Sequence, residues 1–127
     1  MTDKLILYLL PEKLGVCRLE SGALLPDWLQ GSSFYAVTST PDETSLVCLE
    51  ELIPASYPAQ KDFRAFKVKG PLDFALTGIL ASLLNPLAEV GIAVFAISTY
   101  DTDYILVRNN KLNQAIEVLS CVATIIR

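Results

Sequence analysis

Short apolar runs separated by Pro, Gly and Asp predict strands along the first half of the chain. One helical turn is expected over residues 27–30, with Trp28 packed inward. Residues 53–61 contain two prolines and no periodic apolar pattern, so this stretch is the strongest candidate for a linker. The predicted strands cover residues 5–10, 14–19, 34–40 and 44–49, and the last two form a hairpin around Pro41-Asp42-Glu43.

The second half of the chain combines strands with longer helical patterns. A half-exposed strand is expected over 63–70. Asp73 then occupies an N-cap position before a mostly apolar helix over 74–90, which Gly91 should end in a left-handed conformation. Continuous apolar character over 92–97 predicts a strand that is buried on both faces.

The C-terminal residues predict one further strand and one further helix. A polar loop over 98–103 leads into a strand over 104–107, and Asn109 or Asn110 should cap the helix that follows. Residues 122–126 fit either a last strand or the end of that helix. The resulting order, β-α-β-β-α with or without a final strand, is typical of the ferredoxin-like split βαβ unit. The apolar stripe of the second helix consists of Leu112, Ala115, Ile116 and Leu119.

Shifting the chain against itself by 59 residues aligns two hairpin segments. Either a duplication or the frequent use of Ser, Thr and Asp at hairpin turns accounts for the match. A duplication predicts two similar modules, and the cleft between them would be the first place to look for a ligand. The aligned pairs are Ser39-Thr40 with Ser98-Thr99, Asp42 with Asp101, and Leu46-Val47 with Ile105-Leu106, and a similar offset aligns residues 5–11 with 66–71.

Composition excludes several classes of function. Apolar residues make up 52% of the 127 residues, which is enough for a packed core. The chain contains no histidine, which excludes Ser-His and Cys-His nucleophilic catalysis and imidazole ligands for a metal. The net charge is −4, so nucleic acid is not an expected partner. The one basic concentration, over 61–69, is interpreted as the solvated face of a strand rather than as an anion site.

The cysteines and the apolar runs indicate where the protein resides. Cys17, Cys48 and Cys121 each lie beside a valine, which suggests buried thiols in a reducing compartment. No apolar run approaches the ~20 residues that a membrane-spanning helix requires. We therefore expect a cytoplasmic protein that associates with no membrane and binds no metal or cofactor.

Two segments are distinctive enough to suggest a family. Residues 70–91 have the sequence GPLDFALTGILASLLNPLAEVG, and residues 97–107 have the sequence ISTYDTDYILV. Both resemble the ACT-domain-containing proteins, of the type found in cytosolic arginine sensors and in the regulatory domains of aspartate kinase. The resemblance implies an α+β fold, a tandem pair of ferredoxin-like βαββαβ units with side-by-side antiparallel sheets. Residues 1–60 would form a degenerate N-terminal unit and residues 61–127 a C-terminal unit, whose last strand is either absent or supplied by the N-terminal segment.

The resemblance also implies a ligand site, formed by the loop after the first strand and by the end of the second strand. Free amides at a helix start suit a carboxylate, and Asp101 or Asp103 would hold an ammonium group or a cationic side chain. Asp73 is better explained as an N-cap, a role that is compatible with a ligand contact, and the alternative for both later aspartates is that they cap the turn. The implied contacts are Gly70, Pro71, Leu72 and Asp73 in the first segment, and Ile97, Ser98, Thr99, Tyr100, Asp101, Thr102 and Asp103 in the second.

These observations predict a regulatory or sensor module that binds a small molecule, most simply an amino acid, and has no catalytic activity. The alternative is a protein-interaction or dimerisation module that has kept the fold and lost the ligand. In either case a homodimer is expected, because the long, nearly uncharged helix requires cover on two faces.

Overall fold

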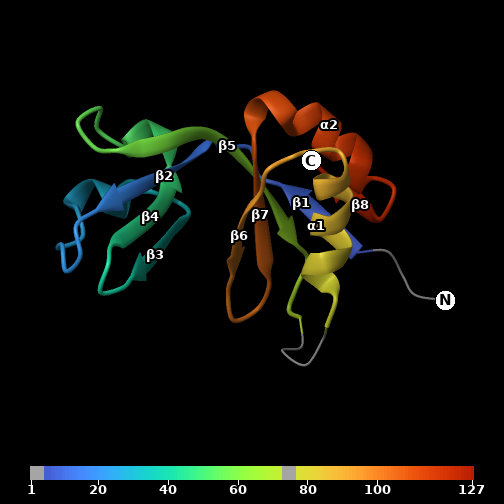
Figure 1. Ribbon diagram of the computed structural model, residues 1–127, viewed down its shortest axis with the longest axis horizontal. Coiled ribbons are helices and arrows are strands. Elements are labelled where there is room, and N and C mark those ends of the chain that lie inside the picture. Colours follow the sequence, from blue (N-terminus) through green and yellow to red (C-terminus); the bar gives the residue numbers. More distant parts are fainter. Residues whose placement is uncertain (1–4, 73–76) are drawn as a thin grey trace. The chain divides into compact units, whose positions relative to one another are not determined.

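The structure, a computed structural model, describes residues 5–72 and 77–127 (Figure 1). It divides into two compact units: Glu12–Phe63, here called the inserted unit, and Met1–Pro11 together with Arg64–Arg127, here called the main unit. This grouping differs from the expected division at residue 60. Residues 5–9 pair with strands of the main unit, so the N-terminal segment groups with the C-terminal half of the chain.

The inserted unit is a four-stranded antiparallel sheet. Its order is β3-β4-β2-β5, which places the first and third strands at the centre, as in a ferredoxin-like unit. Two 3₁₀ turns stand where that fold has helices, which fits the expectation of a degenerate unit. The elements are β2 (Leu14–Leu19), η1 (Asp27–Gly31), β3 (Tyr35–Ser39), β4 (Thr44–Leu49), η2 (Glu50–Leu52) and the first half of β5 (Ala59–Val68).

The expected linker over 53–61 is instead part of this unit. Ile53 is 5% exposed in a core that also contains Cys17 and Leu46. The ring of Tyr57 meets the Trp28 ring edge-on, with centroids 5.4 Å apart, which confirms that Trp28 packs inward. The prolines therefore shape a turn that packs on the sheet, and a strand follows it directly.

The main unit is a five-stranded sheet with two helices. Its order is β6-β7-β5-β1-β8, in which β1 is antiparallel to β5 and parallel to β8. The N-terminal strand thus lies between the first and fourth strands of a ferredoxin-like unit, and the final strand is present as well. The elements, besides β5, are β1 (Leu5–Leu9), α1 (Ile79–Glu89), β6 (Phe95–Ser98), β7 (Asp103–Arg108), η3 (Asn109–Lys111), α2 (Leu112–Leu119) and β8 (Ala123–Ile126).

Both helices pack against one face of this sheet. Leu83 and Leu87 from α1, and Leu119 from α2, join the sheet residues Phe66 and Val68 in one core cluster. The predicted stripe of α2 is confirmed, because three of its four residues are buried. None of the helices that the structure describes is long and apolar enough to span a membrane.

The helix ends differ from the sequence prediction at two points. Helix α1 begins at Ile79 rather than at residue 74, because Gly78 adopts φ 80°, which an α-helix does not accommodate. The predicted N-cap Asp73 lies outside the described residues. Gly91 does end the helix with φ 77°, as predicted. Asn109 and Asn110 form η3 instead of capping α2 with a side chain.

The strand predicted to be buried on both faces is in fact an edge strand. It begins at Phe95 rather than Ile92, and its one partner among the described strands is β7. Alternate residues, Ala96 and Ser98, are exposed. The apolar run was misleading because Ile92 and Val94 pack on the main core before the strand starts.

The two hairpins aligned by the 59-residue shift have the same geometry. In β3–β4, the Thr40 N–H donates to the Glu43 carbonyl at 2.9 Å, and the Glu43 N–H donates to the Thr40 hydroxyl at 3.1 Å. In β6–β7, Thr99 and Thr102 make the same two bonds at 2.8 and 3.2 Å. The second alignment does not relate one unit to the other, because residues 5–9 belong to the main unit and the first strand of the inserted unit is β2.

The cysteines differ sharply in exposure. Cys17 and Cys48 are buried as predicted, whereas Cys121, in the turn after α2, is exposed. Burial raises the pKa of Cys48 to about 11, and the neighbouring Cys17 adds to the effect. Burial also raises the pKa of Cys17, while Lys61 partly opposes this.

We therefore expect one thiol of the native protein to react rapidly with a thiol reagent at pH 8. After unfolding, all three thiols should react. Only the thiolate reacts, and both buried thiols remain protonated and covered at that pH. A Cys121→Ser variant should lose the rapid phase and keep the slow ones. Rapid modification of two or more thiols in the native protein would contradict this assignment.

Candidate ligand-binding site

The loop after β5 is held against the turn of the β6–β7 hairpin. The Leu72 N–H donates to the Asp101 carbonyl at 2.6 Å, and the Thr102 hydroxyl donates to the Val68 carbonyl. Thr102 is only 6% exposed. A Cβ on Gly70 would lie 2.8 Å from the Asp101 carbonyl oxygen, so this close approach requires glycine. The two segments implied by the family resemblance are therefore in contact.

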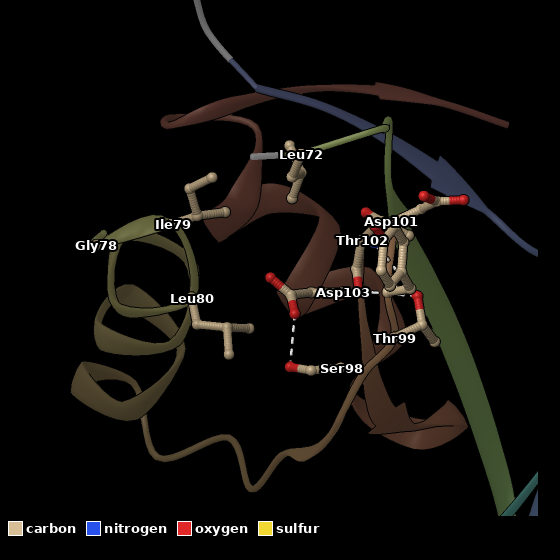
Figure 2. Close-up of a pocket in the computed structure, with 10 residues that line it drawn as sticks. Leu72, Gly78, Ile79, Leu80, Ser98, Thr99, Asp101, Thr102 and Asp103 are labelled. Carbon is tan, nitrogen blue, oxygen red and sulfur yellow. Dashed lines mark hydrogen bonds between the residues drawn. The ribbon is translucent and has the colours of Figure 1, made fainter. Parts of the chain in front are cut away.

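A pocket of about 280 Å³ opens between this hairpin and the start of α1 (Figure 2). One wall is formed by Leu72 and the first residues of the helix, and the other by the end of the hairpin. The backbone N–H groups of the first helical turn have no acceptor within the helix, and they carry the positive end of its dipole. The lining residues of this first pocket are Leu72, Gly78, Ile79, Leu80, Ser98, Thr99, Tyr100, Asp101, Thr102 and Asp103.

The two aspartates point in different directions. The Asp103 carboxylate faces the pocket and accepts a hydrogen bond from the Ser98 hydroxyl at 2.6 Å (Figure 2). The Asp101 carboxylate points away from it (Figure 2), while the Asp101 carbonyl accepts the hydrogen bond from the Leu72 N–H. Ser98 and Asp103 are the last paired residues of the hairpin, which fixes both side chains on the helix side. The pocket therefore presents one oriented carboxylate opposite a helix start.

A second pocket, of about 270 Å³, is walled by the same hairpin turn. It shares Thr99, Asp101 and Thr102 with the first pocket. Lys67 lies in it, with its ammonium nitrogen 6.0 Å from the centre of the Tyr104 ring. Gly70 and Pro71 complete its lining.

Nine of the eleven positions that the family resemblance implies line one of these two pockets. The exceptions are Ile97, which pairs with Tyr104 inside the hairpin, and Asp73, which lies outside the described residues. Sequence reasoning missed Gly78, Ile79 and Leu80, because it started the helix too early. The sequence signal for the true helix start was Gly78, a glycine that directly precedes an apolar stripe. Within the described ranges, no group of three His, Cys, Asp or Glu residues is placed to hold a metal ion.

Comparison with known proteins identifies the family. Residues 59–121 match the family model of the ACT domain, and residues 12–56 match a second family model, described as an N-terminal domain. The chain belongs to the ACT-domain proteins. The two matches meet close to the point at which β5 passes from the inserted unit to the main unit of this ACT-domain protein.

Relatives of this ACT-domain protein include sensors and regulatory domains. A Bos taurus protein named cytosolic arginine sensor for mTORC1 subunit 1 is 34% identical over 98 residues, which cover 68% of this chain and 30% of the bovine one. The chain thus spans less than a third of that relative. An Agrobacterium tumefaciens structure matches with TM-score 0.91 and 34% identity, covering 98% of this chain and 94% of that one.

The fold extends to more distant proteins. The regulatory subunit of aspartate kinase from Thermus thermophilus matches with TM-score 0.63 at 8% identity, covering 91% of this chain and 95% of that one. At this identity the match concerns the fold alone. It supports an α+β ACT-like architecture for the whole chain, as the sequence predicted.

Proposed function

We propose that this chain is a regulatory module that binds a free amino acid in the first pocket and has no catalytic activity. The observation that carries the proposal is the Asp103 carboxylate, oriented by Ser98 and facing the start of α1 across the pocket. Membership of the ACT-domain family and the name of the bovine relative, an arginine sensor, support the same function.

The pocket offers opposite charges to the two ends of a zwitterion. The α-carboxylate would meet the N–H groups of Ile79 and Leu80, where the helix dipole is positive. The α-ammonium or a cationic side chain would meet Asp103 in a charge-assisted hydrogen bond. Because the carboxylate of Asp103 repels a second acid, neutral and basic amino acids should bind better than aspartate or glutamate.

Regulation without catalysis also fits the composition. The histidine-free chain offers acidic residues at the pocket but no nucleophile paired with a base. We further propose a cytoplasmic location, which the name of the bovine relative supports. A homodimer remains part of the proposal, and sedimentation tests it directly. A dimer that is indifferent to every amino acid would favour the alternative, an interaction module that has lost its ligand.

The direct test is a thermal-shift screen of the purified chain with all twenty amino acids, followed by calorimetry. A ligand at 100 times its dissociation constant should stabilise the fold by about 2.7 kcal/mol, a shift that melting curves resolve easily. We expect the strongest response from a neutral or basic amino acid and a weaker one from the acidic pair. The absence of any response at millimolar concentration would refute the proposal.

A further inference from the structure

The inserted unit repeats the hairpin of the main unit but not its first pocket. Thr44 lies 59 residues before Asp103 and occupies the same place in its hairpin, paired with Ser39 as Asp103 is paired with Ser98. It is 2% exposed, and its hydroxyl has no hydrogen-bond partner in the part of the chain that the structure describes. A buried threonine therefore replaces the oriented carboxylate at this position.

The opposite face of the inserted sheet contains a pocket. Cys17 points into the core, so its neighbours Val16 and Arg18 lie on the other face of β2. On that face a pocket of about 280 Å³, here called the open-face pocket, is lined by Val16, Pro58 and Arg18, among others. Its lining is mostly apolar, and its size is similar to that of the first pocket.

Two opposite charges border the open-face pocket. Arg18 lies directly across from Ser45, and Glu43 precedes Ser45 by two residues, so all three share this face of the sheet. The Arg18 guanidinium donates to the Asp42 carbonyl at 3.3 Å, which holds it beside the hairpin turn. The positively charged Arg18 and the negatively charged Glu43 thus lie diagonally from each other beside the apolar lining of the pocket.

The main unit has the same arrangement on its own sheet. Tyr104 lies 59 residues after Ser45. The ammonium nitrogen of Lys67, on β5, lies 6.0 Å from the centre of the Tyr104 ring, and Arg18 lies opposite Ser45 in the β2–β4 ladder. The second pocket places Lys67 beside Asp101 of the hairpin turn. Two units that differ in their helices and in their helix-side residues thus share a basic residue on the first strand and an acidic residue in the turn.

We propose that the open-face pocket of the inserted unit binds a small zwitterion with a short apolar side chain. Arg18 takes the carboxylate through its guanidinium fork, and Glu43 takes the ammonium group. Val16 and Pro58 cover the side chain. This site shares no residue with the first pocket, so it does not depend on the function proposed above.

The test is a titration of the isotope-labelled full chain, followed by amide NMR, with L-valine as the probe. Isovalerate lacks the ammonium group of valine, and isobutylamine lacks its carboxylate. We expect valine to shift the amides of Val16, Arg18, Ser45 and Ala59. Each half-ligand should bind at least about tenfold more weakly, because it leaves one charged group of the pocket unpaired.

Variants locate the binding. Arg18→Met and Glu43→Gln should each remove the valine-induced shifts of these open-face amides, whereas Glu51→Gln, at an exposed acid of the same unit, should leave those shifts unchanged. Asp103→Asn should also leave them unchanged, which separates this site from the first pocket. No shifts at about 20 mM valine, shifts that persist in Arg18→Met, or equal binding of isovalerate would each overturn the proposal.

Discussion

Replacing Asp103 by Asn is expected to weaken the binding of a neutral or basic amino acid by about 10- to 100-fold, or roughly 1.4–2.8 kcal/mol. The substitution keeps the size of the side chain and its contact with Ser98, so it removes little besides the negative charge. A charge-assisted hydrogen bond to the ligand ammonium is thereby replaced by a neutral one. Isothermal titration calorimetry with the strongest amino acid from the screen measures the effect.

The neighbouring aspartate provides a matched control. Asp101→Asn makes the same chemical change two residues earlier, where the carboxylate points away from the first pocket (Figure 2). We expect the dissociation constant of the amino acid from this variant to stay within about twofold of that from the unsubstituted protein. Ser98→Ala should have an intermediate effect, because it loosens the orientation of Asp103 without removing its charge. Equal losses for the two aspartates would contradict the assignment of Asp103.

The sequence was most informative where local pattern decides the structure. Strands β2 and β4 begin and end at the predicted residues, since turn residues bound them on both sides. Gly91 ends α1 as predicted, because a left-handed position strongly favours glycine. The 59-residue repeat was also visible, because Thr40 and Thr99 each close a turn through a side-chain hydroxyl.

The sequence was least informative where distant segments decide the structure. Nothing local to residues 5–9 indicates that they separate β5 from β8, since that position depends on pairing across more than fifty residues. The apolar run before β6 likewise resembles a central strand, although β6 lies at an edge of the sheet. Periodicity reports how many faces of a segment are apolar but not which neighbours cover them.

The candidate site falls between these two cases. Family resemblance indicated both of its segments, and the Leu72–Asp101 hydrogen bond brings them together. The choice between Asp101 and Asp103 could not be made from the sequence. The direction of each side chain depends on where the β6–β7 ladder ends, and the pairing of Ser98 with Asp103 sets that end.

Gly70→Ala is expected to lower the free energy of unfolding by about 1–3 kcal/mol. The new Cβ would lie 2.8 Å from the Asp101 carbonyl oxygen and 3.2 Å from the Thr102 Cβ. The turn cannot move away without straining two hydrogen bonds. The same Asp101 carbonyl accepts a hydrogen bond from the Leu72 N–H, and the Thr102 hydroxyl donates one to the Val68 carbonyl. Urea unfolding followed by circular dichroism measures the change.

Gly31→Ala is the matched control, because its new Cβ would lie 3.7 Å from the nearest atom, on the Leu52 side chain, which is ordinary contact. We expect it to change stability by less than about 0.5 kcal/mol. If the contact between the loop and the turn shapes the first pocket, Gly70→Ala should also weaken amino-acid binding at temperatures where the variant is fully folded. Undiminished binding with reduced stability would restrict Gly70 to a structural role, and equal stability losses for the two glycines would contradict the steric argument itself.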